Sequence, residues 1–263
     1  MSFDFEPTLV LFNSIRLRQE VEDIGVAGFG GCTFTEALST GQSPIVGINH
    51  YYALHQVHGS ALVHPKDPDQ LTNLAPATNE ALHSFPESAD GWFLSKDDWL
   101  QSGIAFCIKT ADCMPLFLFG SQYITMLHAG WRGLQQGIIL TALEQFKVVG
   151  DVPRYAALGP CADPALYEVG EELIKIFPES TAQSLPDRYT LNMYQEAIRQ
   201  LEEGGFSGTL ESSDIHTMSD TRLFSYRSSQ RKSTEGTVQA SDTHNKRNYA
   251  VIGFPQTEDI LNR

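Results

Sequence analysis

The chain is poor in cysteine and has no long apolar segment. Its 263 residues include 4 cysteines, none of them in a Cys-x-x-Cys pair, so disulfides are not expected. The longest apolar runs are about six residues, far short of a membrane-spanning helix, so no membrane partner is predicted. The first residues, Met-Ser-Phe-Asp-Phe-Glu-Pro, lack the basic start and apolar stretch of a signal peptide. These absences predict a cytoplasmic protein.

Positive charge is also scarce. The chain has 18 Lys and Arg against 32 Asp and Glu, a formal net charge of −14. A nucleic-acid partner is therefore not expected, because phosphate backbones bind to basic faces. A small anionic substrate remains compatible with this charge, since two or three well-placed arginines suffice to hold it. The dispersed acidic residues themselves need no explanation beyond solubility.

Hydrophobic content of 41% and aromatic content of 10% allow a sizeable core. The length fits one large domain or two small ones. Apolar residues at helical spacing predict a helix over residues 134–146. Strands and helices do not alternate strictly, which indicates an α+β fold of mixed β-sheets with flanking helices. Further strands are predicted over 104–108, 155–158, 223–227 and 249–254, amphipathic helices over 167–177 and 192–203, and a long polar loop over 228–248.

Three segments carry candidate chemistry at turns marked by Gly or Pro. They are His55-Gln-Val-His58-Gly-Ser, Thr110-Ala-Asp-Cys113-Met-Pro and His128-Ala-Gly-Trp-Arg-Gly133. Together they offer one thiolate and two or three imidazoles. Two nitrogens and one sulfur, with a fourth position free for water or substrate, are the ligands of an open zinc site.

The last two of these segments flank a predicted β-hairpin. Two apolar runs surround Gly120-Ser121, which we interpret as a two-residue type II′ turn with Gly in the first central position. That turn places Cys113 directly opposite His128, with Cβ atoms about 4.5–5.5 Å apart. A three-residue loop would break this register.

Each candidate also has a plainer explanation. A histidine before glycine is commonly a surface residue, Cys113 alone would be a small packed side chain, Arg132 a surface arginine and Trp131 a packing residue. A Cys113–His128 nucleophile pair competes with metal binding, and the third ligand, His58, favours the metal. The helix expected after His128 would begin near residues 130–133, where free backbone N–H groups attract an anion.

Six motifs occur in the order found in one family. The chain resembles the multicopper polyphenol oxidase (laccase-type) family, whose members are also described as purine nucleoside phosphorylases. The resemblance extends from about residue 50 to the C-terminus. The motifs are Gln56-Val-His58-Gly, Thr110-Ala-Asp-Cys113-x-Pro, His128-Ala-Gly-Trp-Arg-Gly133, Leu158-Gly-Pro, Tyr167-Glu-Val-Gly170 and Phe224-Ser-Tyr-Arg227.

The resemblance implies one zinc-binding catalytic domain over residues 1–263, with mixed sheets similar to the catalytic domain of cytotoxic necrotizing factor. It implies one zinc per chain, held by His58, Cys113 and His128, with His55 outside the ligand set. Copper is not expected, because a laccase needs several coppers and the 8 histidines here are scattered.

The activities that the resemblance implies are varied. Family members are described as cleaving adenosine, inosine and methylthioadenosine with phosphate, and as deaminating adenosine. Others are linked to removal of a wrong amino acid from a peptidoglycan precursor, and the older description is phenol oxidation. Purine nucleoside phosphorylase is the expected activity here, with a zinc or Cys–His amide hydrolase as the first alternative, then a polyphenol oxidase or a non-catalytic metal-binding domain.

Several residues receive roles in this interpretation. Cys113, Asp112 and Arg132 are the expected catalytic residues, with Asp112 either a base or a residue that orients the ligands. Nucleoside and phosphate are the expected partners of a monomer or homodimer, and the residues expected to bind them are Gly130, Arg132, Gly133 and Arg227.

The chain departs from the family pattern in three places. The family has an Arg before a Gly-Gly pair near the N-terminus, which we associate with phosphate, whereas this chain has Gly28-Phe-Gly-Gly31 with no Arg. The family's Cys-Thr is His216-Thr here, and its Thr-Gly-Arg is Lys246-Arg-Asn. The zinc ligands are intact, while the use of phosphate is where this chain is expected to differ.

Overall fold

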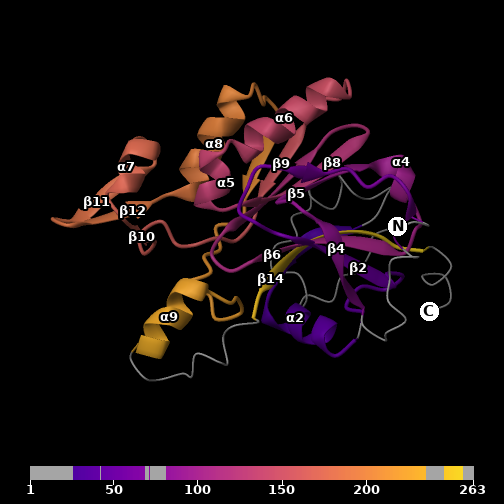
Figure 1. Ribbon diagram of the computed structural model, residues 1–263, viewed down its shortest axis with the longest axis horizontal. Coiled ribbons are helices and arrows are strands. Elements are labelled where there is room, and N and C mark those ends of the chain that lie inside the picture. The colour runs from indigo at the N-terminus through magenta and orange to yellow at the C-terminus, as the bar shows by residue number, and fades with distance from the viewer. Residues whose placement is uncertain (1–25, 42, 69–70, 72–80, 235–245, 257–263) are drawn as a thin grey trace.

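Two large mixed sheets form the centre of the molecule, as a computed structural model shows (Figure 1). The structure describes residues 26–41, 43–68, 71, 81–234 and 246–256. The first sheet has five strands in the order β1 (Val26–Gly30), β14 (Asn248–Phe254), β6 (Ile104–Thr110), β2 (His50–His55) and β4 (Leu82–Ser88). Its strands β2, β4 and β6 are parallel, and β14 is antiparallel to both β1 and β6.

The second sheet has six strands and contains the predicted hairpin. Their order is β13 (Thr209–Ser212), β9 (Tyr155–Leu158), β7 (Met114–Phe119), β8 (Tyr123–Ala129), β5 (Gly91–Ser95) and β3 (Leu62–Val63). A small third sheet, β10 (Glu168–Val169), β12 (Arg188–Leu191) and β11 (Thr181–Leu185), projects from the body together with α7 (Glu172–Ile176).

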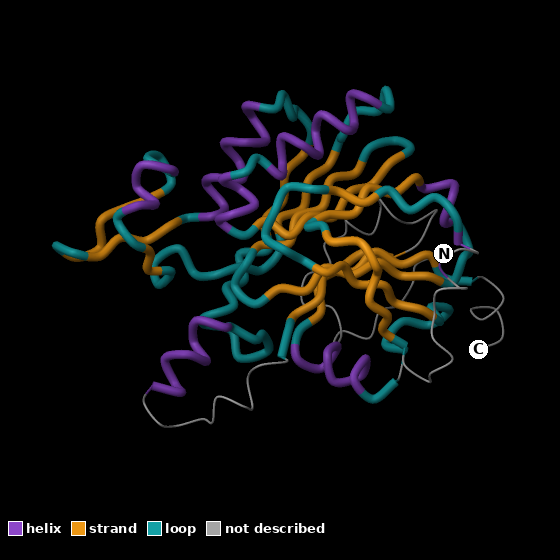
Figure 2. The backbone as a smooth tube through the Cα atoms, viewed as in Figure 1, coloured by secondary structure: helices purple, strands orange, loops and turns teal. Residues whose placement is uncertain are grey.

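Helices cover the outer face of each large sheet, so the molecule has four layers (Figure 2). α5 (Trp131–Gln135), α6 (Ile138–Val148) and α8 (Met193–Glu203) pack on the six-stranded sheet, and α2 (Cys32–Ser39) packs on the five-stranded sheet. Two further short helices are α4 (Lys96–Trp99) and α9 (Tyr226–Thr234).

The alternation of side chains explains why the central strands are apolar throughout. In β7, Phe117 and Phe119 point into the core between the sheets, while Leu116 and Leu118 point toward the helices. Because successive side chains of a strand point to opposite faces, a sheet covered on both sides needs apolar residues at every position. The fold is therefore of the predicted mixed α+β kind. The likeness to cytotoxic necrotizing factor stays a prediction.

Three local predictions were wrong. The segment 223–227, expected as a strand, leads into α9, which begins at Tyr226 inside it and occupies the start of the expected 228–248 loop. Residues 167–177 form the short strand β10 and then α7 instead of one helix. The helix expected over 134–146 is two helices, because Gly137 between them adopts a left-handed conformation with φ 72°. Residues 235–245 of the expected loop lie outside the described part of the chain.

Within the described residues, no helix combines the length and the apolar character that crossing a membrane requires.

Candidate metal centre

The three ligands expected from the sequence come together in space. Candidate ligand atoms of His58, Cys113 and His128 all lie within 4.8 Å of one another. His58 is in the loop after β2, Cys113 directly precedes β7, and His128 is on β8. His128 is buried, Cys113 half-buried and His58 exposed, so the cluster is open on one side. No other group of this kind occurs in the part of the chain that the structure describes.

The predicted register of the hairpin was wrong by two residues. Pro115 pairs with His128, and Met114 pairs with Ala129, so the pairing leads Cys113 toward Gly130. A Cβ atom at Gly130 would lie 2.6 Å from the Cys113 sulfur. Because side chains on one face of a sheet repeat every two residues, a shift of two keeps Cys113 and His128 on the same face as diagonal neighbours. The ligand pair therefore survives the error.

The closed end of the hairpin explains the error. The turn is centred on Ser121 and Gln122, and neither they nor Gly120 has positive φ, so it is not the expected type II′ turn. The carboxylate of Asp151 accepts hydrogen bonds from the backbone N–H groups of residues 121, 122 and 123. A Cβ atom at Gly120 would lie 2.2 Å from the Asp151 carboxylate, so this glycine makes room for Asp151.

A second buried carboxylate, Asp90, organises the ligands. It accepts a hydrogen bond from Nδ1 of His128 at 2.9 Å and others from the backbone N–H groups of Val57, His58 and Gly59. Burial opposes its ionisation, but the hydrogen bonds from His128 and the backbone lower the pKa of Asp90 below its ordinary value. An ionised carboxylate only accepts, so the proton of His128 sits on Nδ1 and Nε2 is free to bind a metal.

Sequence analysis missed Asp90. It lies between Ala89 and Gly91, directly before β5, and only the fold brings it beside His58 and His128, which are 32 and 38 residues away along the chain. Asp before Gly is a common turn pattern, so nothing local distinguishes it.

The loop that carries His58 is held in an unusual conformation. His58 has φ 61°, in the left-handed region that residues with side chains rarely adopt. Its N–H donates to Asp90 and its carbonyl accepts from Gln136 Nε2 at 3.1 Å, so both backbone groups are fixed. The His58 and His128 rings meet edge to face with centroids 4.9 Å apart. Strain of this kind clusters at functional sites.

The charges of the cluster suit a metal cation. Burial alone would raise the pKa of Cys113, but the charges and hydrogen bonds of His128 and His58 together lower it to about 6. Burial alone would lower the pKa of His128, but Cys113 and Asp90 raise it. Without a metal, the pair therefore favours a thiolate beside an imidazolium. A thiolate and two imidazoles with an open side match the donors of an open zinc site.

Asp112 is beside the cluster but turns to the protein. Its carboxylate accepts from the Thr217 hydroxyl at 2.6 Å and from the backbone N–H of Arg227 at 2.7 Å. It has φ 90° and is buried. Of its two expected roles, these contacts favour orientation, because Asp112 fastens the turn before Cys113 to the first turn of α9.

A cavity of about 500 Å³ adjoins the three ligands. The exposed Arg132 stacks on the Trp131 ring at 4.2 Å, and Arg227 lies over the Tyr167 ring at 4.9 Å while its Nη1 donates to the carbonyl of Glu168. The lining residues are His55, Gln56, His58, Lys109, Ala111, Asp112, Cys113, His128, Trp131, Arg132, Tyr167, Tyr226, Arg227 and Arg247. Lys109, Tyr226 and Arg247 were not expected here from the sequence.

Gly130 and Gly133 are buried and permit close packing. Gly130 leaves room for the Cys113 sulfur, and a Cβ atom at Gly133 would lie 3.1 Å from the carbonyl of Gly59. Neither residue lines the cavity. Their positions bring α5 against the metal-binding loops, and α5 has only 5 residues before the break at Gly137. His55, left out of the ligand set, bonds through Nδ1 with Ser88 Oγ at 2.9 Å.

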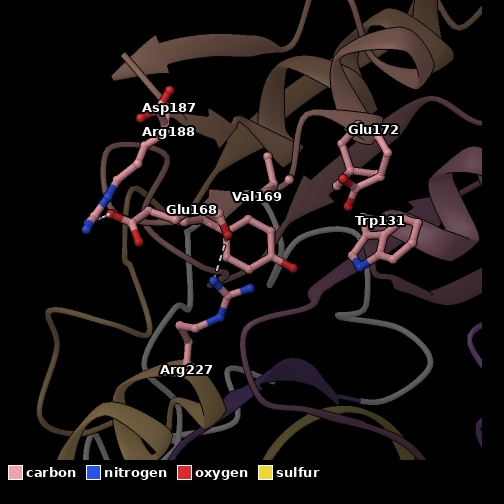
Figure 3. A pocket seen from close by; sticks show the side chains of 10 residues that line it. Trp131, Glu168, Val169, Glu172, Asp187, Arg188 and Arg227 are labelled. Atoms are coloured by element: carbon pink, nitrogen blue, oxygen red, sulfur yellow. Dashed lines mark hydrogen bonds and ion pairs between the residues drawn. The ribbon is translucent and has the colours of Figure 1, made fainter. Parts of the chain in front are cut away.

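A second, smaller cavity of about 280 Å³ shares Trp131, Tyr167 and Arg227 with the first. Figure 3 shows Arg227 at its edge, bonded to the backbone of Glu168, with the carboxylates of Glu168, Glu172 and Asp187 around it. Glu168 is paired with Arg188 at 2.9 Å. The two neighbouring cavities therefore differ in charge.

Comparisons with known proteins agree with the sequence motifs. A family model described as multi-copper polyphenol oxidoreductase laccase matches residues 41–240. A protein of Aquifex aeolicus named purine nucleoside phosphorylase is 35% identical over 103 residues, 39% of this chain and 50% of that protein. One of Pseudomonas aeruginosa with that name is 34% identical over 140 residues, 49% of this chain and 57% of that protein. The matches thus span little more than half the length of these relatives.

Solved structures share the fold. A Bacillus licheniformis protein called YfiH superposes with a TM-score of 0.61 at 18% identity, covering 78% of this chain and 74% of that one. YlmD of Geobacillus stearothermophilus superposes with a TM-score of 0.59 at 20% identity, covering 78% and 73%.

Proposed function

The chain belongs to the family described as multi-copper polyphenol oxidoreductase laccase, and from this premise we propose that it is a zinc-dependent purine nucleoside phosphorylase. The observation that carries the proposal is a cavity lined by His58, Cys113 and His128 together with guanidinium groups that form no ion pair within the described residues. The names of the relatives support the same activity. Adenosine, inosine and methylthioadenosine are the proposed substrates.

Zinc fits the donor set better than copper. The described residues contain one cluster of a thiolate and two imidazoles, whereas a multicopper oxidase needs several histidine-rich sites. Zinc bound by His58, Cys113 and His128 would act as a Lewis acid toward an oxygen of the bound ligand. Asp90 keeps Nε2 of His128 directed at that position through the hydrogen bond to Nδ1.

Arg132 and Arg227 are the proposed phosphate-binding residues. Each guanidinium lies over an aromatic ring, Trp131 for Arg132 and Tyr167 for Arg227, which limits its freedom before a ligand arrives. In phosphorolysis, a phosphate oxygen bonds to C1′ of the ribose while the bond from C1′ to the base breaks. Positioned cations hold the phosphate against C1′ and offset its charge, so orientation and electrostatics supply the catalysis.

A second candidate function is an amide hydrolase, which the hydrogen bond between Asp90 and His128 favours. In a metal-free protein, Cys113, His128 and Asp90 would form a nucleophile, a base and an orienting carboxylate. The candidate amide is that of a peptidoglycan precursor. The two functions differ in their need for metal and for phosphate.

Metal analysis and a phosphate-dependent assay test the proposal together. We expect about one zinc per chain in the purified protein, as one cluster allows. Adenosine and inosine should yield free base and ribose 1-phosphate in phosphate buffer and no free base without phosphate. An ammonia assay on adenosine would detect deamination in the same samples.

Cys113→Ser is the matched variant, with Cys32→Ser on α2 as its control. We expect Cys113→Ser to lose both zinc and phosphorolysis while Cys32→Ser keeps them. Zinc without nucleoside turnover would overturn the phosphorylase proposal and leave the amide hydrolase as the candidate. Turnover that survives in metal-free protein would contradict the role of zinc.

A further inference from the structure

The cavity beside the metal ligands gathers more positive charge than one phosphate requires. Its lining residues include the cations Lys109, Arg132, Arg227 and Arg247, of which Arg227 also lines the smaller cavity. In the described part of the chain, none of the four forms an ion pair with a carboxylate side chain. These four cations lie together in a chain with a net charge of −14, in which carboxylates that could pair with them outnumber the basic residues.

The only carboxylate among the lining residues does not neutralise these cations. Asp112 uses its two oxygens for the Thr217 hydroxyl and the backbone N–H of Arg227. Unpaired cations that converge on a concave site are the usual arrangement for binding an anion.

Lys109, on β6, and Arg247, directly before β14, form one pair beside the five-stranded sheet. Lys109 on β6 is directly opposite Tyr249 on β14, and Arg247 is two residues before Tyr249. Side chains two apart on a strand share a face, so Lys109 and Arg247 are diagonal neighbours. Both are half-buried. Burial first, and next the charge of the neighbouring Arg247, lower the pKa of Lys109.

The fold holds this pair close to the metal loop. Gln56, two residues before His58, accepts from the backbone N–H of Lys109 at 2.8 Å and donates to its carbonyl at 2.7 Å. The carbonyl of Arg247 accepts a hydrogen bond from Thr35 on α2. The backbone at both cations is therefore anchored, and their side chains face the cavity as a prepared surface.

Arg132 and Arg227 belong to different elements, α5 and α9, and stack on different rings. The proposed function assigns inorganic phosphate to them. That leaves Lys109 and Arg247 for a second anion, bound at the same time from the side of the five-stranded sheet.

We propose that the substrate brings this second anion itself, as the phosphomonoester of a purine nucleoside monophosphate. This rests on the proposed function, since it names the substrate class of the same site. A phosphate oxygen would bond to C1′, the bond from C1′ to the base would break, and the base would leave with a proton. The products would be a purine base and a ribose bisphosphate.

The adjoining cavity is unsuited to this anion. Its charged lining residues are the carboxylates of Glu168, Glu172 and Asp187 and the guanidinium groups of Arg188 and Arg227 (Figure 3). The three carboxylates outnumber the two guanidinium groups, so a phosphomonoester binds there less favourably than in the cavity beside the metal ligands. The contrast between the two cavities places the phosphomonoester on the side of Lys109 and Arg247.

Kinetics with matched substrates test the proposal. For the zinc-loaded protein, kcat/KM is measured with inosine, inosine 5′-monophosphate and inosine 3′-monophosphate, all with inorganic phosphate. We expect one monophosphate to exceed inosine by about tenfold or more, the value of one charge-assisted contact. The two monophosphates distinguish which ester oxygen the pair recognises.

Lys109→Gln and Arg247→Gln should each lower the ratio of monophosphate to inosine by about tenfold. Lys147→Gln on α6 and Arg154→Gln before β9 remove an exposed lysine and an exposed arginine away from the cavity and are the matched controls. Equal use of inosine and both monophosphates by the unaltered protein would overturn the proposal, as would a ratio that survives both cavity variants.

A binding measurement separates this proposal from the proposed function. If no ligand is turned over, the phosphorylase proposal fails, and calorimetry with the same three compounds still tests the anion site. Binding of a monophosphate that is about tenfold tighter than that of inosine, and lost in Lys109→Gln and Arg247→Gln, supports the site. Equal affinities for all three compounds overturn it.

Discussion

The two ends of the hairpin formed by β7 and β8 are each organised by one buried carboxylate. At the closed end, Asp151 accepts from backbone N–H groups of residues 121–123 and from the Ser121 hydroxyl. At the open end, Asp90 accepts from the N–H groups of residues 57–59 and from the His128 ring. The same chemical device serves a turn at one end and a candidate metal centre at the other.

The two carboxylates differ in whether the groups around them keep atoms that are free to bind a metal. Asp151 ties together a turn whose polar groups find partners within the protein, so it contributes only stability. Asp90 joins two loops that are far apart in the sequence and leaves His128 Nε2 and the Cys113 sulfur pointing toward a shared space. The proposed function of this hairpin therefore depends on ligand atoms that the organising hydrogen bonds do not use.

Asp90→Asn should have the largest effect on this contrast. An amide cannot stabilise the Nδ1 proton of His128 as a carboxylate does, and its NH₂ group would face backbone donors. We expect zinc affinity to fall by about 10–100-fold, the usual loss for a partner of a metal-binding histidine. Competition with a chelator measures the affinity, and thermal unfolding of metal-free protein measures the accompanying loss of stability.

Asp151→Asn is the control for that experiment. It removes a carboxylate with a similar number of hydrogen bonds, yet it should leave zinc affinity unchanged. A comparable loss of affinity in both variants would show that the hairpin responds as one unit, and the distinction between its ends would be wrong.

Substitution of one glycine at each end of the hairpin should have opposite effects on zinc affinity and on stability. Gly130→Ala places a Cβ atom 2.6 Å from the Cys113 sulfur, so the thiolate must move and zinc should be lost with a modest loss of stability. Gly120→Ala places one 2.2 Å from the Asp151 carboxylate, so the turn must move and stability should fall by about 1–3 kcal/mol with zinc affinity kept. Zinc content and denaturant unfolding of both variants check this, and the reverse pattern would contradict it.

The ligand set was predictable because its residue types and turn residues are local in the sequence. The hairpin register was not, because Asp151 decides the turn from 28–30 residues away. Cys113 and His128 still lie close together as predicted, because side chains on one face of a strand repeat every two residues. A shift of two residues therefore leaves both on the same face.

Other parts of the site needed the fold. Lys109 reaches the cavity from the end of a buried strand and Arg247 from the segment before β14. Lys109 directly precedes the Thr110-Ala-Asp-Cys113 motif, but nothing in the sequence shows that its side chain enters the same cavity as Arg247, 138 residues away along the chain. The helix break at Gly137 follows from its left-handed φ, which hydrophobic spacing does not reveal.

The ionised Asp151 at the closed end of the hairpin should make the stability of the protein depend on pH. Burial opposes ionisation of Asp151, but its hydrogen bonds from Ser121 and from backbone N–H groups lower its pKa to about 2, against 3.8 ordinarily. A lowered folded-state pKa contributes stability above about pH 4 that is lost as the pH falls toward 2. The contribution is roughly 2 kcal/mol.

Unfolding free energies of the unaltered protein and Asp151→Asn, measured between pH 6 and 2 without metal, check this contribution. The difference in unfolding free energy between the two proteins should be largest at pH 6 and should decrease as the pH falls to 2. A gap that stays constant with pH would mean that the Asp151 charge does not stabilise the turn.

The smallest effect should come from Ser121→Ala. The Ser121 hydroxyl donates to Asp151 at 2.6 Å, and its loss should cost about 1 kcal/mol because four backbone N–H groups still satisfy the carboxylate. The counterpart near the open end is Thr217→Val, which removes the hydroxyl that donates to Asp112 at 2.6 Å. Thr217→Val should lower phosphorolysis as well as stability, because Asp112 positions Arg227, whereas Ser121→Ala should leave phosphorolysis unchanged. If the two variants have equal phosphorolysis activity at saturating zinc, Asp112 does not position Arg227 for catalysis.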